Sequence, residues 1–310
     1  MSTVTDTHHA SGSRTPAKPA KAKREGAFFS GFSHLFLAAW ALLVLYPLSW
    51  VVISAFKSDS AILKNPLSLI PDGLHFDNFS RAWTNGKFAS LFFNTIVVLG
   101  GGVTLTMLLG SMAAYVLARY KFPGNRLIYY TFLVGLTVPI YVAAIPLFKL
   151  TDQVGKVFPP LGLNSHAMLI LVYVGWSLSF TVFFMHSFFN TLPNSVAEAA
   201  MVDGASHTRL FFQVMLPMAK PGLVSIAIFN IIGQWNQWYL PVLLMNPADF
   251  AAEKHQVLAQ GMLDLAVNQG YKSDWSGMFA GLTMAMVPVL VVYIAFQRQV
   301  QAGLTGGISK

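Results

Sequence analysis

The sequence predicts an all-α, polytopic membrane protein with six transmembrane helices and a helix-forming cytoplasmic loop between the fourth and fifth of them. Of the 310 residues, 55% are hydrophobic and only 10% are charged, whereas soluble domains carry about 25% charged residues. So few polar side chains cannot cover a fold of this size in water. The prediction therefore rests on this composition, on six long uncharged runs and on one polar segment.

Each uncharged run is long enough to cross a bilayer as a helix. About 20 residues are needed to span a hydrocarbon core of about 30 Å. A helix is required because hydrocarbon offers no hydrogen-bond partners to backbone groups. The expected spans are at about 35–56, 88–118, 127–148, 167–189, 221–248 and 275–297.

The segments outside these runs complete the expected organisation. Residues 1–27 have the composition of a disordered basic tail. A transmembrane domain over 28–298 follows, with its cytoplasmic loop at 191–220, and 299–310 form a C-terminal tail. Both termini are expected in the cytoplasm, because the net charge of +8 then lies wholly on the inner side. Nucleic-acid binding is disfavoured, since no basic stripe is interleaved with aromatic residues.

Small residues and prolines indicate how the expected spans pack. Gly110, Ala114 and Ala118 recur every four residues, so they share one helix face and allow another backbone to approach. The Gly100–Gly102 run is interpreted as a packing contact or, alternatively, as a flexible point. Prolines inside runs should kink the helices. They are Pro139, Pro146, Pro241 and Pro288.

A polar segment of fixed layout, residues 198–217, separates the fourth and fifth expected spans. It consists of Glu-Ala-Ala, three residues, Gly, nine residues, Val, one residue and Leu-Pro. Ser195 and Glu198 have the spacing of a capping box, which predicts a short helix beginning near Val196. Asp203-Gly204 predicts a turn, because glycine adopts positive φ without steric cost.

A second short helix is expected from about Ser206 to Met215, ending before Pro217. Together the two helices would lie along the membrane surface. The alternative is an ordinary amphipathic interfacial helix, which explains Leu210 and Phe211 but leaves the fixed spacing unexplained.

The layout of this segment resembles the EAA loop of the permease subunits of ATP-binding-cassette (ABC) importers. Val214 stands where that family usually has Ile. The positions that match are Glu198, Ala199, Ala200, Gly204, Leu216 and Pro217.

The resemblance extends over nearly the whole chain and narrows to the carbohydrate importers of the maltose type, with MalG-like permeases. Gln237 departs from the pattern, since the family often has an acidic residue after Trp-Asn, and so does the Ile308-Ser309 pair. The matching motifs are Ala113-Ala114-Tyr115 with Ala118-Arg119, Phe122-Pro123-Gly124, Pro146-Leu147, Trp235-Asn236, Leu240-Pro241 and Gly303-Leu304-Thr305.

The resemblance implies that the EAA loop docks in a groove on an ATPase subunit. Glu198 would contact a basic residue of that partner, and Gly204 would provide the bend. The other implied coupling residues are Ala199, Ala200, Asp203, Leu216 and Pro217, while Gly306 and Gly307 of the tail would reach between the ATPase subunits. The implied partners are a second homologous permease, two copies of an ATP-binding subunit and an extracellular solute-binding protein, in the plasma (inner) membrane.

The chain is not expected to be an enzyme or to bind a cofactor itself. It contains no G-x-x-x-x-G-K-[ST] phosphate-binding loop, so ATP is expected to be bound by the partner subunits. It contains no Cys and no clustered metal ligands, so no metal site is predicted. A stand-alone secondary carrier, the main alternative, is disfavoured because the six runs lack Asp and Glu for a proton relay.

A candidate substrate path follows the fifth expected span. Asn230, Gln234 and Gln237 are spaced by four and then three residues, which places them on one helix face. With Trp235 and Asn94 they could bind a neutral sugar. Helix–helix hydrogen bonds by the amides and an interfacial role for the tryptophan are the alternatives. The same importer carrying a polyamine or glycerol phosphate is a second alternative, since the resemblance places most solute selection in the binding protein.

Overall fold

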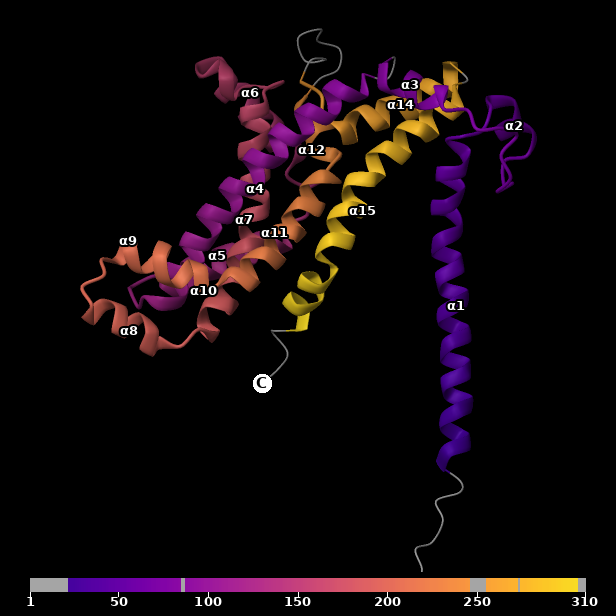
Figure 1. Cartoon of the computed structure of the whole chain (residues 1–310). Helices are drawn as coiled ribbons and strands as arrows, with labels where there is room; N and C mark the ends of the chain where they lie inside the picture. The colour runs from indigo at the N-terminus through magenta and orange to yellow at the C-terminus, as the bar shows by residue number, and fades with distance from the viewer. Residues whose placement is uncertain (1–21, 85–86, 246–254, 273, 306–310) are drawn as a thin grey trace, which may run out of the picture. The chain divides into compact units, whose positions relative to one another are not determined.

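The computed structural model describes residues 22–84, 87–245, 255–272 and 274–305, and every regular element among them is helical (Figure 1). The all-α prediction is confirmed. The helices are α1 (Ala22–Ser54), α2 (Asp59–Lys64), α3 (Asp77–Thr84), α4 (Phe88–Arg119), α5 (Asn125–Thr137), α6 (Ala144–Val157), α7 (His166–Thr191), α8 (Asn194–Val202), α9 (His207–Arg209), α10 (Leu216–Met218), α11 (Lys220–Trp235), α12 (Tyr239–Leu244), α14 (Leu258–Lys272) and α15 (Trp275–Thr305). A 3₁₀ turn, η1, lies at Pro159–Leu161, and a π-helical segment, η2, lies at Leu210–Met215.

Two compact units divide the chain between Trp50 and Val51. In the first unit, α1 is the only element that the structure describes, and its side chains from Ser30 to Ser49 are exposed on all faces. The helix begins at Ala22, so the expected disordered tail over 1–27 is too long by six residues. The extension has a physical reason, because Ala, Lys, Arg and Glu in this stretch are strong helix formers.

Four of the described helices are long and apolar enough to cross a membrane: Ser30–Ser54, Phe88–Arg119, His166–Thr191 and Trp275–Gln299. A fifth span results if the pair His207–Met218 and Lys220–Trp235, bent by 78°, is counted as one. The total of six therefore stays a prediction.

The third and fifth expected spans are not continuous helices. The run 127–148 is interrupted where α5 ends at Thr137, and α6 begins only at Ala144. Pro139 explains this break, because the residue before a proline is pushed out of the helical region, and Val138 is extended at φ −74° and ψ 117°. The run 221–248 is divided between α11 and α12, whereas Pro288 lies inside a continuous α15.

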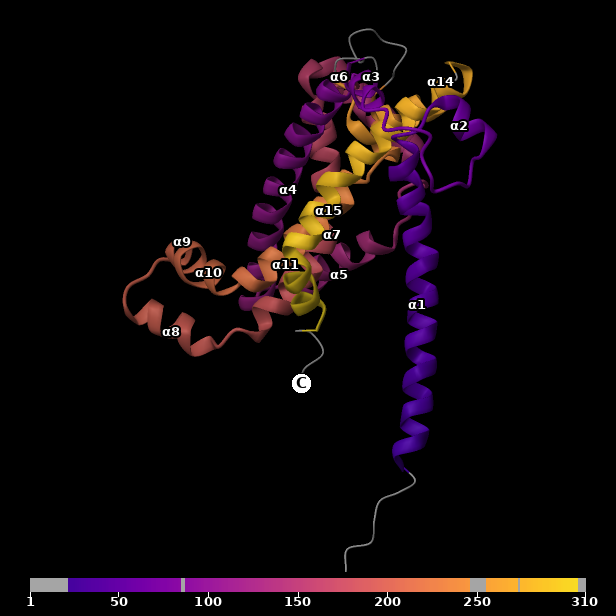
Figure 2. The same cartoon turned by 45° about the vertical axis from the view of Figure 1, so that its right-hand side comes forward.

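In the second unit, α4 and α7 lie side by side (Figure 2). A Cβ placed on Gly110 of α4 would lie 2.6 Å from Cγ2 of Thr181 of α7, and one on Gly101 would lie 2.8 Å from Cδ1 of Ile170. Gly101, Gly102 and Gly110 are therefore packing contacts, as one of the two interpretations predicted. Among the described residues, no heavy atom beyond the neighbouring residues and the backbone of the same helix lies within 4 Å of a Cβ built on Gly100.

The segments α8 to α10 lie at one end of this unit, and α3 and α14 lie at the other (Figure 2). At the α3 end, Arg81 donates hydrogen bonds to Asp274 (3.2 Å), which directly precedes α15, and to Ser276 (3.0 Å) in the first turn of α15. Asn78 donates to the carbonyl oxygens of Ala55 (2.8 Å) and Lys57 (2.9 Å). These bonds fix the segment that follows α1 to the rest of the unit.

Candidate functional site

The polar segment between α7 and α11 forms a helical hairpin, residues 194–218, called the docking hairpin below. Its first helix, α8, begins at Asn194, with Pro193 as N-cap and no side-chain capping bond. The predicted capping box of Ser195 and Glu198 is therefore wrong. Because α8 begins before Val196, Ser195 already lies inside the first turn and cannot act as the cap.

The predicted turn of the docking hairpin is confirmed. Gly204 has φ +80°, a conformation that glycine adopts without the steric cost of a Cβ. Its N–H donates to the carbonyl oxygen of Met201, and the N–H of Ala205 donates to that of Ala200, both at 3.0 Å. This is the bond pattern of a Schellman motif, which satisfies the last free carbonyls of α8.

The second half of the hairpin begins where the sequence predicts but ends later. Ser206 caps α9, since its Oγ accepts a bond from the N–H of Arg209 (3.3 Å). The π-helical segment η2 follows and leads into α10, which continues to Met218. The predicted end before Pro217 is wrong, because this proline lies in the first turn of α10, where the hydrogen-bond pattern changes from π to α and its missing N–H is tolerated.

The hairpin is attached to the helices behind it by an apolar cluster. Tyr115 of α4 packs its ring against Phe211 of η2 (centroids 5.1 Å apart) and Phe189 of α7 (5.5 Å). Burial of aromatic side chains of this size is the main source of stability in such a contact. The buried members of the cluster are Ala114, Tyr115, Leu117, Val182, Met185, Phe189, Leu210, Phe211, Met215, Ala219 and Ile226.

The predicted coupling residues fall on two sides of the hairpin. Ala200 and Leu216 are partly buried and pack against this cluster. The remaining ones are exposed, and Val202 between them is 87% exposed. The exposed set is Glu198, Ala199, Asp203, Gly204 and Pro217. Gly306 and Gly307 lie outside the described residues.

Three predicted substrate-path residues lie close together at a second candidate site, which is formed between packed helices. Asn230 and Gln234 of α11 are only 4% and 6% exposed. Asn230 donates to Oγ1 of Thr181 (2.9 Å), and Gln234 donates through Nε2 to Oγ of Ser177 (3.2 Å). The side-chain amides of Asn230, Gln234 and Gln237 all border a cavity of about 330 Å³, called the amide cavity below. Its other lining residues are Gly135, Leu136, Tyr173, Trp176, Ser177, Phe180, Phe229, Gly233 and Leu240.

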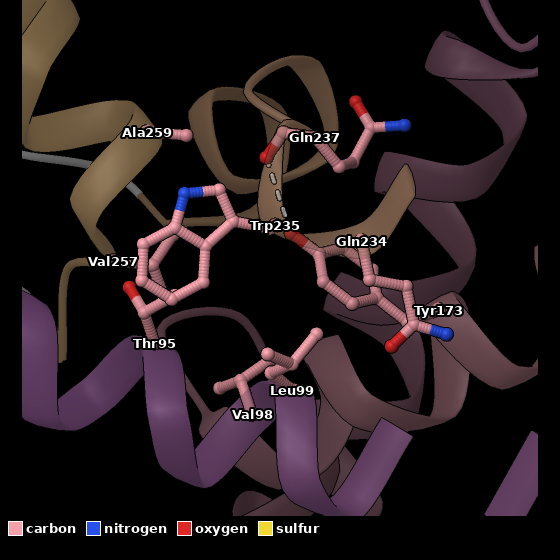
Figure 3. A pocket seen from close by; sticks show the side chains of 9 residues that line it. All are labelled: Thr95, Val98, Leu99, Tyr173, Gln234, Trp235, Gln237, Val257 and Ala259. Carbon is pink, nitrogen blue, oxygen red and sulfur yellow. Dashed lines mark hydrogen bonds between the residues drawn. The ribbon is translucent and has the colours of Figure 1, made fainter. Parts of the chain in front are cut away.

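The side-chain oxygen of Gln234 is left without a donor. Among the described residues Oε1 is buried and has no hydrogen-bond partner, which costs about 1–3 kcal/mol when nothing else satisfies it. Gln234 also borders a separate void of about 10 Å³ next to Val98 and Tyr173 (Figure 3). Such a void has room for about one water molecule. The hydroxyl of Tyr173 donates to the carbonyl oxygen of Gln237 (3.2 Å) across the same region.

Trp235 and Asn94 do not line the amide cavity, although Trp235 borders the small void together with Gln234 and Gln237. Trp235 is buried in an apolar cluster, with its ring 5.9 Å from that of Phe92. Asn94 donates to the carbonyl oxygen of Gln256 (2.8 Å). For these two residues the structure shows packing and a tertiary hydrogen bond, and neither lines the amide cavity.

Sequence reasoning missed the aromatic side of the amide cavity, which belongs to α7. Tyr173, Trp176, Ser177 and Phe180 all line it. Their spacing of three, one and three residues places them on one face of a helix. This spacing is visible in the sequence of the fourth expected span. It does not stand out there, because the span is hydrophobic on every face.

Known proteins resemble this chain in sequence and in fold. The diacetylchitobiose uptake system permease protein of Streptomyces coelicolor is 46% identical over 279 residues, which are 90% of this chain and 88% of that protein. The galactooligosaccharides transport system permease protein of Bacillus subtilis is 28% identical and covers 90% of this chain and 95% of its own length.

A solved structure shares the fold. A chain in the crystal structure of a bacterial ABC transporter involved in the import of the acidic polysaccharide alginate superposes with a TM-score of 0.75. The match has 24% identity and covers 92% of this chain and 99% of that one. Residues 106–306 match the family described as "Binding-protein-dependent transport system inner membrane component". The chain belongs to this family of inner-membrane transport components.

Proposed function

We propose that this chain is a permease subunit of an ATP-driven ABC importer that moves a neutral sugar or oligosaccharide across the plasma (inner) membrane. The observation that carries the proposal is the amide cavity, whose lining contains amides, two hydroxyl groups and aromatic rings but no charged side chain. A polyamine would require acidic groups and glycerol phosphate would require basic ones, because a buried charge needs a partner. A neutral, hydroxyl-rich solute needs neither.

The solutes in the names of several relatives are neutral oligosaccharides, which supports a sugar as the solute. They include diacetylchitobiose, galactooligosaccharides and arabinooligosaccharides. Amides recognise hydroxyl groups through hydrogen bonds, and an aromatic face such as that of Trp176 provides a flat apolar surface for a sugar ring. In this proposal Asn230, Gln234 and Gln237 form the polar side of the solute path.

The proposed assembly contains a second homologous permease, two copies of an ATP-binding subunit and an extracellular solute-binding protein. ATP is bound and hydrolysed by the ATP-binding subunits, and this chain performs no catalysis. The exposed face of the docking hairpin, with Glu198 and Gly204, seats on one of these subunits. Both termini lie in the cytoplasm, where the tail with Gly306 and Gly307 reaches the ATPase dimer.

Uptake by the reconstituted importer tests the proposal. The four components are placed in proteoliposomes with ATP inside, and radiolabelled diacetylchitobiose, spermidine and glycerol 3-phosphate are offered with the binding protein outside. We expect uptake of the sugar alone and only with a hydrolysable nucleotide. Uptake of a charged solute instead, or uptake without ATPase subunits, would refute the proposal in favour of the other solutes or of a secondary carrier.

Substitutions in the amide cavity test its role within the same assay. Asn230→Leu and Gln234→Leu should impair sugar uptake without loss of complex assembly. Asn236→Leu is the matched control, because Asn236 is an exposed amide on the next turn that does not line this cavity. If the first two variants assemble and transport normally, the cavity is not the path and the second permease supplies the sugar contacts.

A further inference from the structure

The end of α4 is bonded to the point where α7 gives way to the docking hairpin. Arg119 is the last residue of α4. Its Nη2 donates to the carbonyl oxygen of Leu192 (2.7 Å), and its Nη1 donates to Oδ1 of Asn194. Leu192 is the C-cap of α7 and Asn194 is the first residue of α8. One guanidinium group therefore bridges the junction between these two helices.

Tyr120, the C-cap residue that follows α4, is bonded to the other arm of the hairpin. The hydroxyl of Tyr120 lies 2.8 Å from Nδ1 of His207, and the two rings are 5.6 Å apart between centroids. His207 is the first residue of α9, beyond the turn at Gly204. The last residue of α4 and its C-cap thus hold the hairpin on both sides of α8 and its turn, and Glu198 and Ala199 of α8 remain exposed.

The same helix contacts the amide cavity residues at a distance from the hairpin. A Cβ on Gly110 would lie 2.6 Å from Cγ2 of Thr181, the residue that accepts a bond from Asn230. A Cβ on Gly102 would clash with Oε1 of Gln234. From Gly102 to Arg119 a helix extends about 25 Å at 1.5 Å per residue. The helix is continuous over this stretch, so it connects the hairpin directly to the contacts of Gly102 and Gly110.

We infer that Arg119 and Tyr120 are positioning residues that transmit displacement of the docking hairpin to α4, and through Gly102 and Gly110 to the amides of α11. The inference rests on the proposed function, since it concerns how an importer of this kind couples ATP hydrolysis to passage of its solute. Lysine cannot replace Arg119 here, because an ammonium group lacks the planar fork that reaches two acceptors at once.

The test measures sugar taken up per ATP hydrolysed by the complete reconstituted importer, with complex yield as a second readout. Arg119→Gln, Arg119→Lys and Tyr120→Phe should assemble but lower this ratio about fivefold or more, the lower end of ordinary coupling between sites. The controls are Arg126→Gln and Tyr130→Phe, which change an exposed cation and an exposed phenol of α5, the next helix along the chain. Both controls should keep the wild-type ratio.

A double-mutant cycle identifies the bond itself. Asn194→Ala alone should lower the ratio in part, and its effect should not add to that of Arg119→Gln, because both remove the same hydrogen bond. A wild-type ratio in assembled Arg119→Gln and Tyr120→Phe complexes would overturn the inference. Loss of complex assembly in both variants would also overturn the inference, because the hydrogen bonds would then be needed for folding alone. Failure of the wild-type importer to take up sugar would instead reject the proposed function.

Discussion

Gly102 of α4 and Gln234 of α11 are in direct contact, and a Cβ on residue 102 would overlap with Oε1 of the glutamine. The side chain of Gln234 is buried between α4 and α7 and donates to Ser177. The absence of a side chain on residue 102 is therefore what allows an amide to lie beside α4 at the edge of the amide cavity.

Gly102→Ala should displace Gln234 and reduce sugar uptake. The added methyl group has no space, and overpacking of this kind costs about 1–3 kcal/mol. Gly100→Ala is the control, since no other described part of the chain lies within 4 Å of a Cβ there and alanine favours a helix over glycine by about 1 kcal/mol. The thermal stability of the purified complex should fall for the first variant and hold or rise for the second. Equal stability and uptake in the two would contradict the packing argument.

Gly204→Val should weaken binding of the ATPase subunit by distorting the hairpin turn. The residue has φ +80°, and a left-handed conformation costs an ordinary L-residue about 1–2 kcal/mol. Gly204→Asn should be tolerated, because asparagine adopts this conformation more readily. Co-purification of the ATPase with each variant measures the effect. Retention of the ATPase by the valine variant at the wild-type level would show that the turn is not needed for docking.

Glu198→Ala should lower affinity for the ATPase without changing the stability of this chain. Pro193 occupies the N-cap and makes no side-chain cap bond, and Glu198 is exposed, so the substitution removes no capping interaction that would be worth about 1 kcal/mol. Thermal unfolding in detergent and ATPase co-purification separate the two effects. A fall in unfolding temperature with unchanged co-purification would assign Glu198 a purely structural role.

Trp176→Ala should raise the apparent KM for sugar uptake more than Trp238→Ala does. Trp176 lines the amide cavity, whereas Trp238 borders a separate apolar groove beside α14 and α15. Loss of a stacking surface weakens binding of a sugar ring, and an aromatic contact contributes about 0.5–1.5 kcal/mol beyond its buried area. Uptake measured over a range of sugar concentrations gives the apparent KM of each variant. The reverse order of KM values would place the path along the groove.

Single cysteines should report the orientation of the two ends of the molecule. The sequence contains no Cys, so a membrane-impermeant thiol reagent labels only the introduced residue. Ser206→Cys, in the docking hairpin, should be labelled only from the cytoplasm, and Ser80→Cys, exposed on α3, only from outside. Labelling of both from one side would refute the predicted topology.

Local patterns in the sequence determined the features that depend on neighbouring residues. The helical membrane-spanning character follows from long uncharged runs, since a backbone in lipid must satisfy its own hydrogen bonds. The turn at Gly204 follows from the freedom of glycine at positive φ. The shared face of Asn230 and Gln234 follows from helical spacing alone. These predictions required no knowledge of what each helix touches.

Only the tertiary structure decided which of several locally allowed arrangements occurs. It placed Trp235 in an apolar cluster and Trp176 at the amide cavity, although both are tryptophans in apolar runs. In the structure, Ala200 packs against the apolar cluster formed with α4 and α7, whereas the neighbouring Ala199 is exposed. The bonds from Arg119 to the start of the hairpin join residues more than 70 positions apart. Such contacts depend on how distant segments pack, and periodicity along one segment carries no information about its neighbours in space.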